Sequence, residues 1–158
     1  MEDNRFYTVR GYQIHEQSKN VLSASLEDYL EMIYREMAKE GYVRVNTLAS
    51  MLNVSPSSAS KMIAKLNELG FIDYEKYGVI RLTEKGNHLG RYLLWRHDTV
   101  CNFFELILRK KDQNAFIEAE LVEHILNKDT VENIEKLTEF ILNDKDLASR
   151  LNEYLEEN

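Results

Sequence analysis

The chain has 158 residues, of which 44% are hydrophobic and 30% are charged, and its formal net charge is −7. This length suits one medium domain or two small ones that share a core, and the composition argues against disorder beyond the termini. No apolar run approaches the roughly 18 to 20 residues of a membrane-spanning helix, and residues 1–19 are polar without a secretory segment. Cys101 is the only cysteine, so no intrachain disulfide can form, and we expect a cytoplasmic protein that is not bound to a membrane.

The negative net charge hides an uneven distribution along the chain. Residues 41–96 carry eight Lys or Arg against four Asp or Glu, whereas residues 1–40 carry five against eight and residues 97–158 carry seven against fifteen. Attraction to phosphate is local and is screened beyond about 10 Å, so a basic middle segment can contact DNA within an acidic protein. The pattern favours a DNA-contacting module joined to one that does not touch DNA.

The first predicted element is a helix that starts near Ser25, shows apolar residues at helical spacing and stops at Gly41. A short helix over about residues 47–52, capped by Asn46, follows it. Residues 1–22 show no strong periodicity, and we treat them as an N-terminal extension without an assigned role.

A third helix is predicted to begin at Ser55-Pro56, because serine is a good N-cap and proline fits the first turn of a helix. Its apolar stripe leaves Ser57, Ser58, Lys61 and Lys65 on the outward face. An alternating pattern over residues 71–82, with a turn near Tyr77-Gly78, then predicts a β-hairpin. Two short helices followed by a hairpin indicate a winged helix-turn-helix, and a helical bundle with an attached hairpin is the alternative.

This arrangement identifies a set of candidate DNA-contacting residues. They lie at the start and on the outward face of the third helix and at the tip of the hairpin: Ser55, Pro56, Ser57, Ser58, Lys61, Lys65, Lys76 and Tyr77.

The rest of the chain is predicted to be helical. Thr83 opens a long helix that runs to about Leu108 and has a wide apolar face. Helices over about residues 113–126, 130–142 and 145–155 follow. The expected fold is therefore mainly α, with an N-terminal winged helix-turn-helix over residues 23–83 and an all-helical metal-binding and dimerisation domain over residues 84–158.

Potential metal ligands are distributed over three of these helices. Asp28 and Glu31 share one face of the first helix. Glu120, Glu123 and His124 have i, i+3, i+4 spacing and so share one face of a later helix. Carboxylate and imidazole donors together suit borderline to hard divalent ions, so Mn²⁺ or Fe²⁺ leads and Zn²⁺ competes. The full candidate set is Asp28, Glu31, His97, Glu120, Glu123 and His124.

Each cluster also has a purely structural interpretation. Residues 25–28 match a helix-capping box, so Asp28 could cap the first helix, and a single histidine such as His124 is more often structural than a ligand. Four neighbouring carboxylates nevertheless repel one another unless cations neutralise them, and two divalent ions would balance their charge. Cys101, one turn after His97, could approach such a site or be a small buried apolar residue.

Five segments of the chain carry a family resemblance: residues 27–34, 55–62, 74–77, 96–97 and 120–124. In this order they resemble the diphtheria toxin repressor family, in its manganese-responsive branch. The resemblance covers about residues 23–143. It implies a winged helix followed by a helical dimerisation domain, with all six candidate ligands at metal-binding positions.

The resemblance also indicates which metal activates the protein. Iron-responsive relatives place Met and Cys where this chain has Asp28 and Glu120, so the harder ligands favour manganese. Cys101 stands where relatives often carry a glutamate, and Phe116 stands where iron-type members have a further histidine. We therefore do not expect an ancillary metal site of that kind.

These observations predict a homodimeric, Mn²⁺-activated repressor of metal-uptake genes that binds a palindromic site on double-stranded DNA. Up to two ions per subunit are expected, with Fe²⁺ as the alternative activator and Zn²⁺, Co²⁺ or Cd²⁺ able to bind in vitro. An iron-responsive repressor of the same family and a metal-independent winged-helix regulator are the competing functions. An enzyme of the di-iron bundle type is not expected, because those enzymes carry a Glu-x-x-His motif on each of two helices, and this chain has no such pair.

Overall fold

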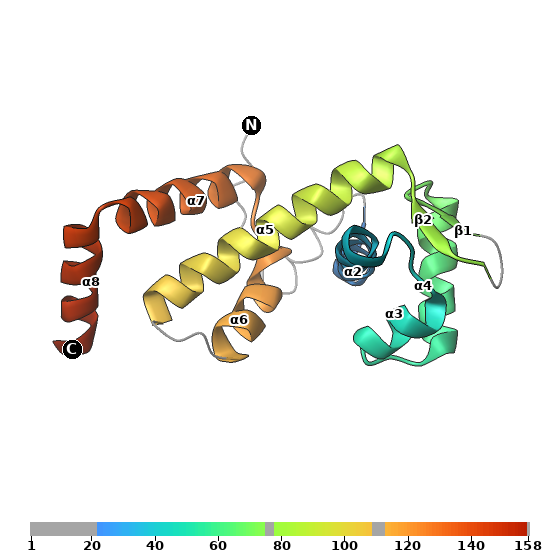
Figure 1. The fold of residues 1–158 in the computed structure, drawn as a ribbon, viewed down its shortest axis with the longest axis horizontal. Helices are drawn as coiled ribbons and strands as arrows, with labels where there is room; N and C mark the ends of the chain where they lie inside the picture. Colours follow the sequence, from blue (N-terminus) through green and yellow to red (C-terminus); the bar gives the residue numbers. More distant parts are fainter. Residues whose placement is uncertain (1–21, 75–77, 109–112, 158) are drawn as a thin grey trace, which may run out of the picture. The chain divides into compact units, whose positions relative to one another are not determined.

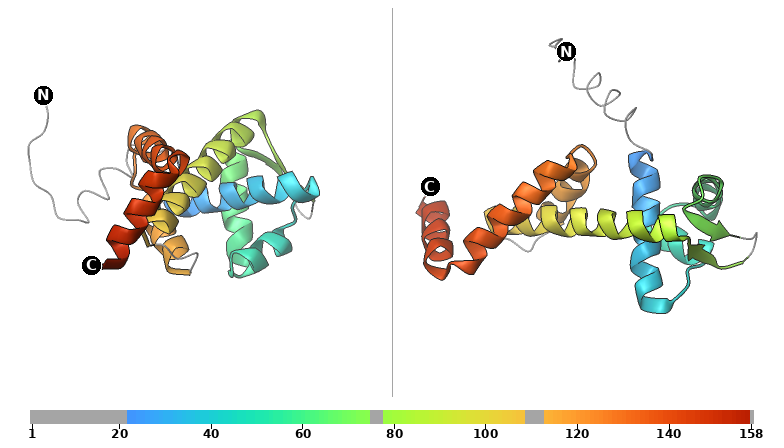
Figure 2. Two further views of the ribbon diagram at one scale, coloured as in Figure 1. Left: turned by 60° about the vertical axis from the view of Figure 1, so that its left-hand side comes forward. Right: turned by 90° about the horizontal axis from the view of Figure 1, so that it is seen from above.

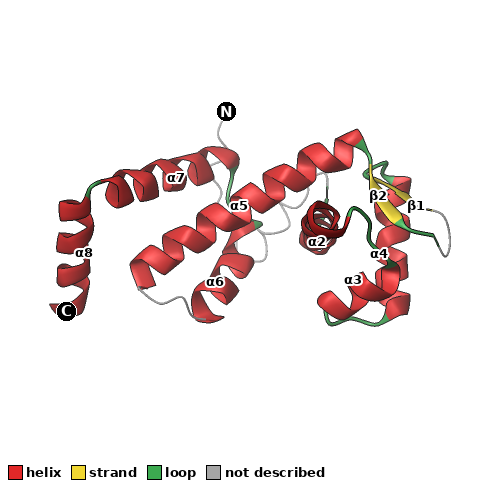
Figure 3. Cartoon of the chain, in the orientation of Figure 1, coloured by secondary structure: helices red, strands yellow, loops and turns green. Residues whose placement is uncertain are grey.

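The computed structural model describes residues 22–74, 78–108 and 113–157. Figure 1 shows the order of the elements along the chain, and Figure 3 shows that helices make up most of the described part. The chain divides into two compact units, residues 1–94 and 95–158, which we describe separately. None of the helices in the described segments is long and apolar enough to span a bilayer.

The first unit begins with helix α2 (Ala24–Glu40). The backbone carbonyl of Ser23 accepts hydrogen bonds from the amides of Leu26 and Glu27, so the chain is already helical at Ser25. The N-cap is Ser23, so the alternative interpretation of residues 25–28 as a capping box does not hold. The stop predicted at Gly41 is confirmed: this residue has φ 74° and its amide donates to the carbonyl of Met37.

Helices α3 (Val45–Met51) and α4 (Pro56–Glu68) form the helix-turn-helix, and the views in Figure 2 keep them side by side. The N-cap of α3 is Arg44, so the prediction that Asn46 caps this helix is wrong. The prediction for α4 is confirmed, because the Ser55 hydroxyl accepts from the Ser58 amide and Pro56 occupies the first turn.

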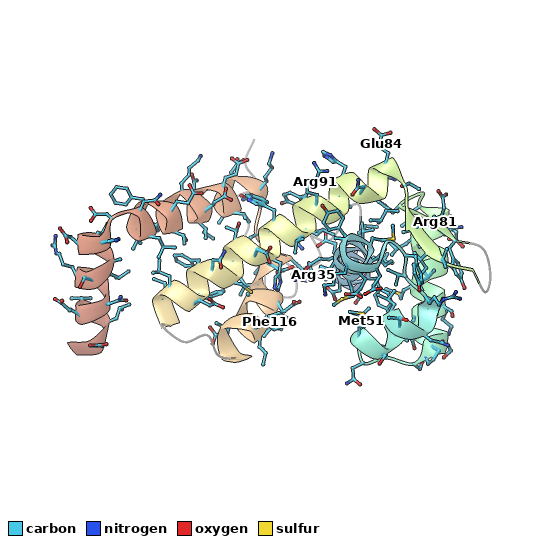
Figure 4. All side chains as sticks on the ribbon, viewed as in Figure 1. Arg35, Met51, Arg81, Glu84, Arg91 and Phe116 are labelled. Atoms are coloured by element: carbon cyan, nitrogen blue, oxygen red, sulfur yellow. The ribbon has the colours of Figure 1, made fainter. Side chains whose placement is uncertain are left out.

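The wing consists of strands β1 (Ile72–Tyr74) and β2 (Ile80–Leu82), paired antiparallel with Asp73 opposite Arg81. Val43, just before α3, also pairs with Ile80 through two backbone hydrogen bonds. This pairing directs the chain into α3, which explains why α3 starts earlier than local sequence signals predict. Figure 4 marks Arg81 on the wing and Met51 on α3.

The start of the long helix α5 (Glu84–Leu108) is held tightly against the wing. The Thr83 hydroxyl lies 2.8 Å from the Gly70 carbonyl oxygen and accepts from the Gly86 amide at 3.1 Å, as a capping side chain does. A Cβ added to Gly86 would lie 1.8 Å from the Phe71 carbonyl oxygen. Only glycine fits at this contact without moving the backbone of the wing.

The core of the first unit joins all of these elements. It contains buried apolar side chains from α2, α3, α4, both strands and α5, and its largest fully buried members are Leu30, Ile33, Leu48, Ile63, Leu66, Phe71, Ile72, Ile80 and Leu93. This core fixes the outward face of α4 relative to the wing.

The second unit contains the remainder of α5 together with α6 (Gln113–Glu123), α7 (Lys128–Asn143) and α8 (Lys145–Glu157). Helix α6 ends three residues earlier than the sequence predicts, because the amides of Ile125 and Leu126 bond to carbonyls only three residues back. The Asn127 side chain accepts from the Thr130 amide and starts α7.

Candidate metal centre and nucleic-acid interface

The first candidate ligand pair lies on α2, where Asp28 and Glu31 are nearly one turn apart. Glu31 is buried, and its Oε1 lies 2.7 Å from the Arg35 guanidinium. Burial raises the pKa of Tyr29, and the Asp28 carboxylate adds to this effect. With Ser23 as the N-cap, Asp28 lies beyond the first turn, which removes the helix-capping interpretation of this residue.

The other candidate ligands belong to the second unit, and the fold brings them together from α5 and the end of α6. His97 is buried, and its Nδ1 lies 2.9 Å from Glu123 Oε2 and 3.3 Å from Glu120 Oε1. Glu120 and His124 form a second pair whose potential ligand atoms lie within 4.8 Å of each other. Because α6 stops at Glu123, His124 reaches this position from the turn after the helix.

Arg96 is a member of this cluster whose role the sequence analysis missed. Its guanidinium is buried, donates to Glu123 Oε1 at 3.3 Å and donates to His124 Nδ1 at 3.0 Å. Glu123 is fully buried, so its charge is balanced by Arg96 on one oxygen, while His97 contacts the other. Arg96 precedes His97 in the sequence, but no local signal indicates contacts 27 and 28 residues away.

Cys101 lies one helical turn after His97, and its Sγ is 3.3 Å from His97 Nε2. Of the two interpretations of this residue, the contact favours the one in which it approaches the ligand cluster. Burial raises the pKa of the Cys101 thiol to about 11, and the carboxylates of Glu123 and Glu120 add to this effect. The residue is therefore a neutral thiol at neutral pH when no cation is near.

The donor set of the second unit fits a divalent cation. Carboxylate oxygens of Glu123 and Glu120 converge on the buried His97 imidazole, and the Arg96 ion pair described above balances only the first of these two charges. Oxygen and nitrogen donors of this kind suit borderline to hard ions such as Mn²⁺, Fe²⁺ and Zn²⁺. The ring of Phe116 packs edge-on against His97 at a centroid distance of 5.2 Å. Phe116 is labelled on α6 in Figure 4.

The candidate nucleic-acid interface is the start and outward face of α4. The hydroxyl of Ser55 lies 3.0 Å from that of Ser57 and 2.9 Å from that of Ser58, so the N-terminus of α4 presents a cluster of small polar groups. Lys61 and Lys65 are exposed, and Lys65 forms an ion pair of 3.3 Å with Glu68. The other two candidate contacts, Lys76 and Tyr77, lie outside the described residues.

Comparison with known proteins gives two family models that together cover most of the chain. The model described as iron dependent repressor, N-terminal DNA binding domain, matches residues 21–80. The model described as iron dependent repressor, metal binding and dimerisation domain, matches residues 83–156. The HTH-type transcriptional regulator MntR of Oceanobacillus iheyensis is 36% identical over 133 residues, or 84% of this chain and 90% of the relative. The chain belongs to the iron-dependent repressor family.

Other comparisons agree with this family assignment and confirm the resemblance to its manganese-responsive branch. MntR of Bacillus subtilis is 36% identical over 129 residues, covering 79% of this chain and 90% of the relative. A solved manganese-dependent transcriptional repressor in complex with manganese matches with a TM-score of 0.66 and 28% identity over 73% of this chain. The manganese regulator SloR matches with a TM-score of 0.63 and 28% identity over 71% of this chain. The chain spans about half the length of these two structures, at 53% and 52%.

Proposed function

We propose that this family member is a homodimeric, Mn²⁺-activated repressor that acts in the cytoplasm on metal-uptake genes. The observation that carries the proposal is the division of a hard donor set between two units of a chain whose first unit is a winged helix. Asp28 and Glu31 lie on α2, and the other four donors lie in the second unit. We propose residues 23–83 as the DNA-binding domain and residues 84–158 as the metal-binding and dimerisation domain.

The residue types support Mn²⁺ as the activator. All six proposed ligands are carboxylates or imidazoles, and this combination includes no thiolate or thioether that would favour a softer ion. The similar proteins include regulators named for manganese. Fe²⁺ is the second candidate, because its preferences overlap those of Mn²⁺. Zn²⁺ generally binds such sites more tightly, so affinity alone does not identify the activator.

The proposed mechanism links the ligands to the reading helix. When bound, the metal supplies positive charge that neutralises the carboxylates of both units. A cation held by Asp28 and Glu31 together with the ligands of the second unit would remove conformational freedom of the winged helix that DNA binding would otherwise have to remove. Operator and metal then favour each other's binding by the same factor.

The surface of the second unit supports dimerisation through this half of the chain. Large apolar side chains there are between 48% and 73% exposed, which is more than an isolated helical unit usually leaves in contact with water: Phe116, Ile117, Leu121, Ile125, Leu137, Phe140, Leu142 and Tyr154. We propose that a second copy covers part of this surface. Two winged helices related by a twofold axis then read a palindromic site.

The proposal is tested by measuring DNA binding with and without metal. A duplex that binds the protein in Mn²⁺ is selected from a randomised pool, and fluorescence anisotropy gives its affinity in chelator, Mn²⁺ and anaerobic Fe²⁺. Mn²⁺ should tighten binding by about 5- to 150-fold, the usual range of allosteric coupling. Glu120→Gln should lose most of this response, whereas Glu118→Gln, an exposed change on the same helix, should keep it. Equal affinity in chelator and in Mn²⁺ would refute the switch.

A further inference from the structure

The two ring nitrogens of His97 face different chemical groups. Nδ1 lies 2.9 Å from Glu123 Oε2 and 3.3 Å from Glu120 Oε1. Nε2 lies 3.3 Å from the sulfur of Cys101. The imidazole is therefore held between two carboxylates on one side and a thiol on the other.

This arrangement decides which nitrogen can bind a cation together with the carboxylates. A cation that joins Glu123 and Glu120 to His97 must bind at Nδ1, because that nitrogen faces both carboxylates. A nitrogen that binds a metal is deprotonated, so the ring hydrogen is then on Nε2. In that tautomer the hydrogen would point towards Cys101 Sγ, which lies 3.3 Å from Nε2.

We infer that Cys101 is a positioning residue of the metal centre, because its sulfur accepts the Nε2 hydrogen of His97 and so holds the ring with Nδ1 towards the cation. The inference rests on the proposed metal-binding function. Metal-ligating histidines usually donate their second ring N–H to a carboxylate, a carbonyl or water, and removing such a partner typically weakens metal binding by about 10- to 100-fold. Here the i, i+4 spacing on α5 brings a thiol to the same place.

A sulfur acceptor has a particular consequence for the strength of the site. Sulfur is a weaker hydrogen-bond acceptor than a carboxylate oxygen, so it withdraws less of the Nε2 hydrogen and leaves His97 a less basic ligand. Cys101 therefore orients His97 without strengthening its bond to the metal as much as an acidic residue would. This suits a sensor that must release its ion when the concentration falls.

The main experiment compares three substitutions at this position. Cys101→Ser keeps an acceptor, whereas Cys101→Ala and Cys101→Val remove it, and valine also fills the space. Mn²⁺ affinity is measured by the electron paramagnetic resonance of the free ion, and thermal melts of the metal-free proteins report folding. We expect the Ala and Val variants to bind Mn²⁺ about 10- to 100-fold more weakly and the Ser variant to stay close to wild type. Wild-type affinity in the Ala and Val variants would overturn the inference.

Two further measurements use the wild-type protein, so they do not depend on whether a variant folds. In the diamagnetic Zn²⁺ form, ¹H–¹⁵N correlation spectra of the histidines should show His97 protonated at Nε2, and protonation at Nδ1 would overturn the inference. In the Co²⁺ form, an intense near-ultraviolet charge-transfer band from sulfur would make Cys101 a direct ligand, which also contradicts it. If the wild-type protein binds none of these ions, the proposed function fails first, and this result is distinct from every outcome at Cys101.

Discussion

The buried ion pair between Arg96 and Glu123 allows a quantitative test of the metal centre. The two side chains are 4% and 1% exposed, and their nearest charged atoms are 3.3 Å apart. At an effective dielectric constant of about 20, this separation gives an attraction of roughly 5 kcal/mol. Removing one partner of such a pair typically costs about 3 to 5 kcal/mol, because the other charge is left buried. We therefore expect Arg96→Met to lower the free energy of unfolding by about 3 to 5 kcal/mol in chelator.

Urea denaturation followed by circular dichroism measures this loss, and the chain offers a matched control. Arg91→Met removes an exposed arginine of the same helix, marked in Figure 4, and should change stability by no more than about 0.5 kcal/mol. In excess Mn²⁺ the deficit of Arg96→Met should narrow, because a bound cation also neutralises Glu123. Glu123→Gln should show no such recovery, since it removes a ligand. If Arg96→Met is as stable as Arg91→Met in chelator, the charge balance described for Glu123 is incorrect.

Three further predictions concern DNA, metal choice and folding. The double mutant Lys61→Ala/Lys65→Ala should bind DNA more weakly. In titrations at several salt concentrations, the slope of log affinity against log salt concentration should fall by an amount that corresponds to up to about two phosphate contacts. Unchanged binding would mean that another surface reads DNA. Asp28→Met should lose much of its response to Mn²⁺ in anisotropy assays but retain more of its response to Fe²⁺ or Co²⁺, whereas an unchanged metal ranking would exclude Asp28 as a ligand. Gly86→Ala should be destabilised by more than 1 kcal/mol in urea melts, because its Cβ would overlap the Phe71 carbonyl oxygen, and a stable variant would show that the wing can move aside.

The parts of the fold that the sequence predicted are those with local causes. The start of α4 depends on Ser55 and Pro56, which act on the first turn next to them, and the start of α5 depends on Thr83 in the same way. The predicted start of α3 was wrong because the observed start depends on a contact between residues far apart in the sequence. Val43 pairs with Ile80, a residue 37 positions later, and this pairing sets where the helix begins.

The candidate site shows the same division between local and distant causes. The spacing of Asp28 and Glu31, and that of Glu120 and Glu123, puts each pair on one helix face, and the residue types are enough to suggest a metal. The role of Arg96 could not be predicted, because it depends on contacts between α5 and the end of α6. The proximity of Cys101 to His97 follows from helical spacing, but only the structure shows which ring nitrogen it meets.

Helix α5 has a consequence for how this protein can be divided or recombined. The boundary between the two compact units falls between Leu94 and Trp95, inside a continuous helix of 25 residues, rather than in a flexible linker. A chain cut at this boundary would leave the last four backbone carbonyls of one fragment and the first four amides of the other without helical partners. It would also end one fragment next to Leu93, which is fully buried, and begin the other next to Arg96 and His97. The point between Leu94 and Trp95 is thus a poor place to divide the chain for exchange of its two compact units.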